Sequence, residues 1–154
     1  MAFDTLKDRL CQSTALYTPR IGALFIMRTD ASGIAVAACL NQLENDVVVV
    51  DEKGTGERPL AFCSQKLIPT QCAWSLIERE AYAVIHALKK FHNLIFGAPI
   101  IVYSDHNPLS YIKECAPKSA KLMRWALALQ EYDLTFRYVK GVNNASADCL
   151  SRLI

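Results

Sequence analysis

The stretch LFIMRTDAS, residues 24–32, is an apolar run that ends in an acidic residue. Its first part, Leu24 to Met27, has the length and composition of a short, fully buried strand, so Asp30 is expected just where that strand leaves the core. Two interpretations of Asp30 are open. It either opens the turn of a hairpin, because Asp, Ser and Gly favour turns, or binds a metal ion whose charge offsets the desolvation of the carboxylate.

Length and composition restrict the class of protein. The 154 residues fit one domain of ordinary size, and a hydrophobic fraction of 52% argues against disorder. Lysine and arginine number 17 against 15 acidic residues, a net charge of +2, which favours neither a strongly basic nucleic-acid clamp nor an acidic tail. Any binding of a polyanion therefore has to come from local patches.

The six cysteines are scattered, without a CxxC pair or a close group of Cys and His typical of zinc sites. We interpret them as reduced core residues. The sequence shows no cationic, apolar and cleavable leader and no apolar run near about 18 residues. We therefore expect an intracellular, cytoplasmic protein with no membrane partner, whose oligomeric state is unknown.

Three strands joined by hairpins are expected to begin the sheet. The apolar run Gly33 to Gln42 is bounded by turn residues and predicts a second strand that pairs back on the first. Residues 47–50 predict a strand extension, Asp51 to Pro59 a flexible polar tip, and Leu60 to Ser64 a returning third strand. This first part of the sheet is therefore expected to be antiparallel.

From Ser75 onward the apolar residues recur with the period of a helix. On a helical wheel Glu80 falls beside the apolar stripe, so we expect it to point toward the sheet; a flanking surface position is the alternative. Glu78 falls on the other shoulder and is expected to face solvent or to form an ion pair. The stripe consists of Ile77, Ala81, Val84, Leu88 and Phe91.

A second acid is expected at the end of a strand. Gly97 stops the helix, and Pro99 to Ser104 predicts a strand followed directly by Asp105. A helix between two strands favours a right-handed crossover and parallel pairing, so this strand should lie beside the first, with Asp105 at the same sheet end as Asp30. The crevice at that end is the usual ligand site of open α/β sheets.

Two helices are predicted next. Residues 107–114 indicate a short helix that Pro117 breaks, and Ser119 to Tyr132 indicates a longer one. Trp125 lies on the apolar stripe of the longer helix, so we expect a core anchor rather than a platform for base stacking.

A strand and a terminal helix complete the prediction. Asp133 to Val139 alternates apolar and polar residues, which indicates a half-buried strand. Residues 145–153 indicate a helix with Asp148 in or near its first turn. An acid there either interacts with the helix dipole or belongs to a site.

Six sequence strings together resemble the ribonuclease H domain of Ty3/gypsy-type retrotransposon polyproteins, which are retroviral-like reverse transcriptases. They match that family in order and with near-family spacing, and the order of the acids, Asp, Glu, Asp, Asp, is similar to that of the ribonuclease H fold. The strings are TDAS (29–32), AFCSQKL (61–67), WSLIEREAYAVIHAL (74–88), YSDHNPL (103–109), RWALALQEYDLTFRYVKG (124–141) and NNASADCLSR (143–152).

The resemblance implies an α/β, ribonuclease H-like fold. Its five-stranded mixed sheet has three antiparallel strands and then two parallel ones, with helices on both faces. Residues 1–20 would be a linker from a preceding polymerase or connection region, and residues 21–154 the ribonuclease H domain. The chain would then be a piece of a longer polyprotein, found in virus-like particles if the element is active.

The resemblance also implies a metal-dependent endonuclease that hydrolyses the RNA strand of RNA/DNA hybrids during reverse transcription. Asp30, Glu80, Asp105 and Asp148 match the family's catalytic, metal-binding carboxylates. Two Mg²⁺ ions, with Mn²⁺ as a substitute, are the expected cofactors, because phosphodiester hydrolysis needs an activated water and a stabilised leaving oxygen. The expected partners are the RNA/DNA hybrid, read through its 2′-hydroxyls, and the polymerase domain of the same polyprotein.

The sequence departs from the family pattern at several positions. Residues 35–38 are Ala-Val-Ala-Ala where the family commonly has Gly-Ile-Gly-Ala, and Trp74 replaces a common Tyr. Residues 117–120 leave no room for a basic helical protrusion, and residues 139–147 contain no His. We expect His106 to make a structural hydrogen bond, and the isolated domain to bind hybrid weakly.

Two other functions are open. A catalytically lapsed module of the same fold, serving structure or nucleic-acid positioning in a reverse transcriptase, would be favoured by the loss of any one acid. A DNA transposase or integrase core has a similar topology, but those proteins use three acids with the Glu last, whereas here the Glu comes second. The four acids therefore favour the nuclease.

Overall fold

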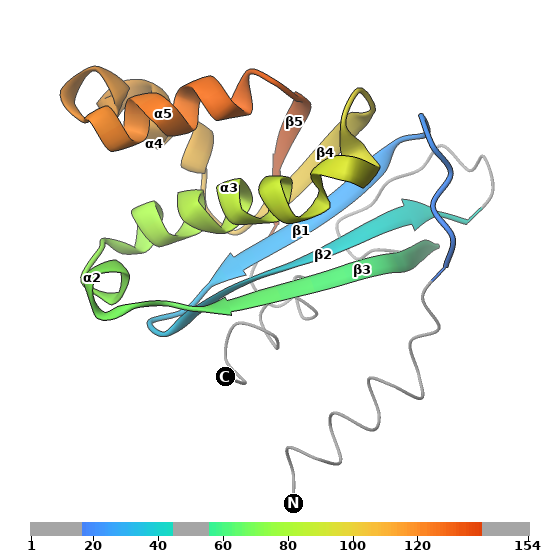
Figure 1. The fold of residues 1–154 in the computed structure, drawn as a ribbon, viewed down its shortest axis with the longest axis horizontal. Coiled ribbons are helices and arrows are strands. Elements are labelled where there is room, and N and C mark those ends of the chain that lie inside the picture. The colour runs from blue at the N-terminus through green and yellow to red at the C-terminus, as the bar shows by residue number, and fades with distance from the viewer. Residues whose placement is uncertain (1–16, 45–55, 140–154) are drawn as a thin grey trace, which may run out of the picture.

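The computed structural model describes residues 17–44 and 56–139. Within these ranges the chain forms one five-stranded sheet in the order β3-β2-β1-β4-β5 (Figure 1). β1, β2 and β3 pair antiparallel, whereas β4 pairs parallel with both β1 and β5, as predicted. The strands are β1 Phe25–Ala31, β2 Ala35–Leu43, β3 Glu57–Lys66, β4 Pro99–Ser104 and β5 Asp133–Tyr138, and the helices are α2 Pro69–Cys72, α3 Leu76–Ile95, α4 Pro108–Cys115, the 3₁₀-helix η1 Ala116–Lys118 and α5 Ala120–Leu129.

β1 is longer than the sequence predicted. Asp30 lies inside this strand, paired with Ala37 of β2, rather than just beyond the strand end. The pairing continues because β2 returns through a tight turn, in which the amide of Ser32 donates to the carbonyl of Ala35 at 2.8 Å. The neighbouring strand thus determines where β1 ends.

β3 also begins earlier than predicted. Residues 57–59, expected in a polar tip, are its first residues, and Glu57 pairs with Leu43 of β2. The Glu57 side chain is only 6% exposed. The predictions for residues 47–50 and 51–55, and the helix predicted for residues 145–153, lie outside the described residues.

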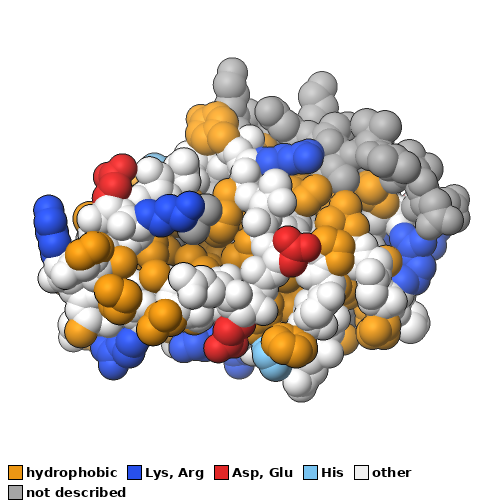
Figure 2. Space-filling model, turned by 90° about the horizontal axis from the view of Figure 1, so that it is seen from above, with side chains coloured by type: hydrophobic (Ala, Val, Ile, Leu, Met, Phe, Trp, Pro, Cys, Tyr) orange, Lys and Arg blue, Asp and Glu red, His pale blue; other side chains and the backbone are white. Residues whose placement is uncertain are grey.

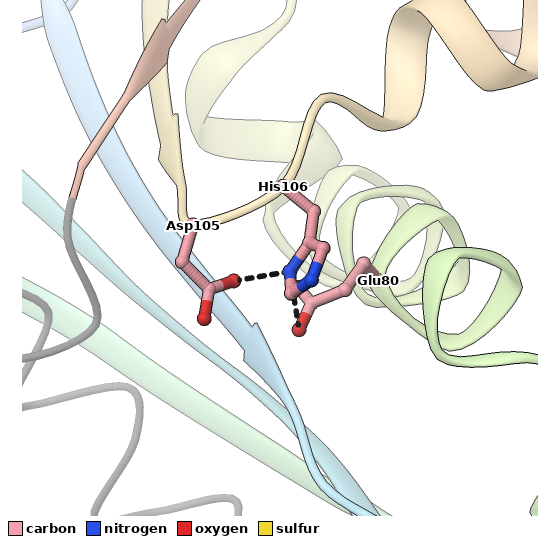
Figure 3. Close-up of side chains that lie close together, drawn as sticks. All are labelled: Glu80, Asp105 and His106. Carbon is pink, nitrogen blue, oxygen red and sulfur yellow. Dashed lines mark hydrogen bonds and ion pairs between the residues drawn. The ribbon is translucent and has the colours of Figure 1, made fainter.

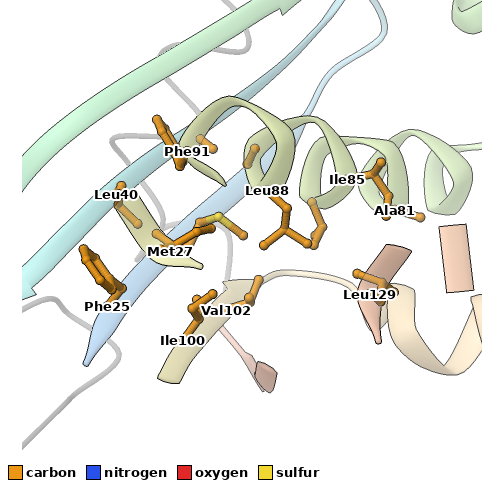
Figure 4. Packing of buried hydrophobic residues seen from close by; sticks show 14 of the residues in the cluster. Phe25, Met27, Leu40, Ala81, Ile85, Leu88, Phe91, Ile100, Val102 and Leu129 are labelled. Carbon is orange, nitrogen blue, oxygen red and sulfur yellow. The ribbon is translucent and has the colours of Figure 1, made fainter. Parts of the chain in front are cut away.

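Helix α3 packs along one face of the sheet (Figure 4). It begins where predicted, because the Ser75 hydroxyl caps its first turn by accepting from the amide of Glu78 at 3.3 Å. It ends before Gly97, whose φ of 81° is a conformation that favours glycine. The apolar stripe of α3 packs against Met27 and Val102, both completely buried, so the helix is held at a defined height above β1 and β4.

Helices α4 and α5 lie on the same side of the sheet as α3 (Figure 1). Trp125 of α5 is 8% exposed and its ring lies 5.6 Å from that of Trp74, which confirms the predicted core anchor. α5 ends at Leu129 rather than at Tyr132, because the next three amides donate to carbonyls three residues back and tighten the chain into turns. None of the described helices is long and apolar enough to cross a membrane.

The other face of the sheet carries a buried polar network. Arg28 of β1 donates to both carboxylate oxygens of Glu57, at 2.7 and 3.0 Å, and its guanidinium lies 4.5 Å from the centre of the Tyr103 ring. Asn41 of β2 donates to Glu57 at 2.8 Å. These contacts tie β1, β2 and β3 together with charges that neutralise each other inside the protein.

The described cysteines are free thiols. Cys39 is buried, and Cys63 and Cys115 are half-buried, in agreement with the predicted core positions. Cys72 is exposed, so the prediction is wrong there, because the short helix α2 has no buried residue.

Candidate metal centre at the end of the central strands

Two of the predicted acids meet where β4 ends (Figure 3). Asp105 follows the last residue of β4, and Glu80 projects toward it from α3. One ligand atom each of Glu80, Asp105 and His106 lies within 4.8 Å of the other two. Helix α3 and the parallel strand β4 therefore assemble a group of potential metal ligands at the expected end of the sheet.

Asp30 lies beside this group without being one of its three members. It is 4% exposed, and the amide of the next residue, Ala31, donates to Glu80 Oε1 at 3.3 Å. The negative charge of Asp30 also contributes to a raised pKa of Glu80. Asp148 lies outside the described residues, so its place at the site stays a prediction.

Glu80 is buried without a strong counter-charge. It is 1% exposed, and no lysine or arginine of the described ranges forms an ion pair with it. Its Oε2 atom is buried and has no hydrogen-bond partner among the described residues. Burial, followed by the negative charges of Asp105 and Asp30, raises the pKa of Glu80 to about 9. A bound cation would remove the cause of this shift, because it offsets both the desolvation and the repulsion between acids.

Glu78 has a different environment from Glu80, although both lie in the first turns of α3. Lys121 donates to Glu78 at 3.0 Å and the Tyr111 hydroxyl donates to it at 2.9 Å. The prediction that Glu80 points to the sheet and Glu78 forms an ion pair is therefore confirmed. Glu78 joins α3 to α4 and α5 and has no contact with the acid group.

His106 makes the predicted hydrogen bond and one further approach. Its Nδ1 lies 2.8 Å from Asp105 Oδ1, and the same nitrogen lies 3.7 Å from Glu80 Oε1. The adjacency of Asp105 and His106 was visible in the sequence, whereas the approach to Glu80, which comes from a different element, was not. The imidazole restricts the orientation of Asp105.

The alanines that replace common family glycines pack without disturbing β2. Ala35 and Ala37 are 0% and 1% exposed. Pairing between β2 and its neighbours is regular along residues 35–40, and Ala37 stands opposite Asp30. The added methyl groups are therefore part of the core beside the acid group.

Comparisons with known proteins identify the family of the chain. A family model described as "RNase H-like domain found in reverse transcriptase" matches residues 21–132. The chain belongs to this RNase H-like family. The RNase H-like chain is 36% identical over 153 residues to the Pol polyprotein of transposon opus and 33% identical over 152 residues to that of transposon 297, both from Drosophila melanogaster. It is 28% identical over 157 residues to the Tf2-3 polyprotein of Schizosaccharomyces pombe.

These relatives are Pol polyproteins of Ty3/gypsy-type transposons, which confirms the family expected from the sequence strings. The matches cover 99% of this RNase H-like chain but only 11% to 14% of each relative. The chain therefore spans a small part of the length of the polyproteins that it matches.

Solved structures show the same fold. A foamy virus protease-reverse transcriptase in complex with double-stranded DNA has a TM-score of 0.67 at 20% identity, over 90% of this chain and 28% of that one. The same viral protein in complex with an RNA/DNA hybrid has a TM-score of 0.64 at 21% identity, over 82% and 16%. LC9-RNase H1 has a TM-score of 0.52 at 13% identity, over 89% and 72%. The predicted ribonuclease H-like fold and its mixed five-stranded sheet are confirmed, whereas α3, α4 and α5 cover one face, so helices on both faces stay a prediction.

Proposed function

We propose that this domain is a divalent-metal-dependent endonuclease that hydrolyses the RNA strand of RNA/DNA hybrids during reverse transcription. The observation that carries the proposal is Glu80, a buried acid with an unpartnered oxygen that faces Asp105 at the end of the central strands. Carboxylate oxygens are the ligands that Mg²⁺ prefers, so the donor set fits this ion. Membership in a reverse transcriptase family supports the choice of substrate.

Asp30, Glu80, Asp105 and Asp148 are the residues proposed to hold two Mg²⁺ ions, for which Mn²⁺ can substitute. When bound, such ions supply positive charge that activates a water and stabilises the leaving oxygen of the phosphodiester. The residues of the chain do the positioning. The amide of Ala31 donates to Glu80 Oε1, and His106 holds Asp105 Oδ1, so the two carboxylates keep one orientation.

Protonation of Glu80 is also coupled to cation binding. Because its pKa is raised to about 9, its carboxyl is protonated near neutral pH in the absence of a cation. The carboxyl therefore releases a proton when its oxygens become ligands. Cation binding is expected to weaken as the pH falls.

Most of the affinity for the hybrid is proposed to come from the polymerase domain of the same polyprotein. On the face shown in Figure 2, lysine and arginine side chains stand apart among hydrophobic and polar ones and do not form one basic patch. The net charge of the chain is only +2. The family relatives extend far beyond this segment, so a neighbouring domain is available to bind phosphates.

The test is cleavage of a hybrid whose two strands carry different labels, in Mg²⁺ and at low salt, where phosphate contacts are strongest. We expect cutting of the RNA strand alone and no cutting of duplex DNA. Asp105→Asn, which removes a proposed ligand, should lower the rate by about 100-fold or more. Asp133→Asn is the matched control, since Asp133 is an exposed acid at the start of β5, and should cut normally.

Two results would contradict the proposal. One is equal cutting of both strands. The other is an absence of cutting by a folded protein that binds Mg²⁺, and this second result would favour the catalytically lapsed module.

A further inference from the structure

We propose that Glu80, Asp105 and His106 form a site for a borderline divalent transition-metal ion such as Co²⁺ or Zn²⁺, with His106 Nδ1 as a ligand. The inference rests on the proposed function in that Glu80 and Asp105 are the same carboxylates. It adds a nitrogen donor, which Mg²⁺ does not require.

The separations of the ligand atoms suit one small ion. Two ligands held about 2.1 Å from a metal are about 3.0 Å apart at octahedral angles and about 3.4 Å apart at tetrahedral angles. His106 Nδ1 lies 2.8 Å from Asp105 Oδ1 and 3.7 Å from Glu80 Oε1, so the observed distances bracket that range. All three donors lie within 4.8 Å of one another, so small side-chain movements would bring them onto one ion.

The environment of Glu80 independently indicates that this place suits a cation. The Glu80 side chain is 1% exposed, and its Oε2 has no hydrogen-bond partner among the described residues. The carboxyl points toward Asp105 and His106 rather than into the apolar core (Figure 3). A buried polar atom without a partner destabilises the fold, and a bound cation would remove that cost.

The imidazole can change from hydrogen-bond donor to ligand without a change in its own charge. A neutral His106 that donates Nδ1–H to Asp105 carries no proton on Nε2. Transfer of the proton from Nδ1 to Nε2, through solvent, frees the Nδ1 lone pair for a metal. Access is open, because the side chains of His106 and Asp105 are 36% and 24% exposed.

Imidazole nitrogen changes which ions the site prefers. Affinities of mixed nitrogen and oxygen sites rise along the first transition row toward copper and remain high for zinc, whereas Mg²⁺ prefers oxygen and retains its waters. Co²⁺ and Zn²⁺ are therefore expected to bind more tightly than Mg²⁺, and the excess affinity is expected to depend on His106.

The decisive experiment uses the full chain labelled with ¹⁵N and Zn²⁺ as the probe. Zn²⁺ is diamagnetic, so a long-range ¹H–¹⁵N spectrum of the imidazoles reports which ring nitrogen is bound. We expect a change at His106 Nδ1 that is complete at one equivalent, with no change at His92, whose Nδ1 is hydrogen-bonded to the Tyr132 hydroxyl at 2.6 Å.

Calorimetry on a variant separates ligation from positioning. In His106→Gln the amide can still donate to Asp105 but no longer offers an imidazole lone pair. We expect Zn²⁺ affinity to fall by about 10-fold to 100-fold and Mg²⁺ affinity to fall much less, because the glutamine keeps a donor for Asp105. His86→Gln is the matched control, because His86 lies in α3 outside the three-residue group, and both affinities should be unchanged.

An unchanged His106 Nδ1 signal at saturating Zn²⁺ would overturn the inference, as would equal losses of Zn²⁺ and Mg²⁺ affinity in His106→Gln. If that variant does not fold, the spectrum of the unsubstituted chain still tests whether His106 Nδ1 binds Zn²⁺. Cleavage of hybrid in Mg²⁺ without zinc ligation by His106 would leave the proposed function intact. Zinc ligation without cleavage would leave only the inference intact.

Discussion

Among the described residues, Glu57 and Glu80 both have nearly inaccessible side chains, but their charges are balanced in different ways. Glu57 of β3 accepts two hydrogen bonds from Arg28, at 2.7 and 3.0 Å, and a third from Asn41 at 2.8 Å. Glu80 of α3 accepts one bond from the amide of Ala31 at 3.3 Å, and its Oε2 has no partner among the described residues. Their side chains are 6% and 1% exposed, so burial alone does not distinguish them.

This difference in charge compensation indicates a separate role for each acid. A buried carboxylate that has an internal counter-charge holds strands together, because breaking the pair leaves a charge in a medium of low dielectric. A buried carboxyl beside other acids, without lysine or arginine, is stable only when protonated or when a cation arrives from solvent. Glu57 therefore serves the fold, and Glu80 is suited to bind a ligand.

The largest effect is expected from breaking the internal pair. Arg28→Met leaves Glu57 buried without its counter-charge and should lower the free energy of unfolding, measured in urea, by about 3 to 5 kcal/mol. Arg58→Met is the control, because Arg58 pairs with Glu44 at the surface, where the side chains are 39% and 50% exposed. That change should cost about 0 to 1 kcal/mol. Equal losses in the two variants would remove the distinction between buried and exposed pairs.

The next largest effect is expected from Glu80→Gln, which removes the titrating carboxyl and should stabilise the metal-free protein. Its pKa in the folded chain is about 9, above the ordinary 4.5, so between these values the folded state holds a proton that the unfolded state has lost. Stability of the metal-free protein therefore falls as the pH rises through this window. Glu80→Gln has no such proton, and its advantage should grow by up to about 1.4 kcal/mol per pH unit.

Urea unfolding of both proteins with a chelator, at about pH 5 and about pH 8, measures this advantage. The gain should appear at the higher pH and be small at the lower one. A constant difference between the two proteins would mean that Glu80 does not titrate as its surroundings require.

A smaller gain is expected from the cation itself. An ion that binds only the folded state at about ten times its dissociation constant adds about 1.4 kcal/mol of stability. Mg²⁺ should therefore raise the melting temperature of the unsubstituted protein, and raise it less in Glu80→Gln. Superimposable melting curves with and without Mg²⁺ would count against an assembled metal centre.

The smallest effect is expected at Glu78, two residues from Glu80 in the same helix. The Glu78 and Lys121 side chains are 21% and 30% exposed, so Glu78→Gln should lower the free energy of unfolding by about 1 kcal/mol or less. Cleavage of hybrid should be unaffected. A loss of cleavage matching that of Asp105→Asn would mean that Glu78 also belongs to the site.

Local sequence signals predicted the bounds of an element correctly where its residue pattern and the residues that end it indicate the same positions. β4 has the predicted bounds, Pro99–Ser104, because Gly97 and Asp105 frame a short β-rich run. The signals failed where a neighbouring strand prolongs pairing, as in β1, which continues to Ala31, and β3, which begins at Glu57. Pairing energy comes from a partner strand, which a local window does not contain.

The candidate site was partly predictable for the same reason. The helical wheel indicated that Glu80 points to the sheet, and the parallel crossover indicated that Asp105 and Asp30 share one sheet end. The approach of His106 to Glu80 was not predictable, since it depends on the path of the chain after β4 and on the height of α3 above the sheet.

The sequence by itself determined the order of strands and helices, the apolar side of α3 and the family, because these depend on periodicity, stop residues and matching strings. Only the tertiary structure decided which buried charges are compensated. Arg28 reaches Glu57 across 29 positions of the sequence, whereas no lysine or arginine of the described ranges pairs with Glu80. Electrostatic compensation acts over a few ångströms between residues distant in the chain, so it is determined only when the chain has folded.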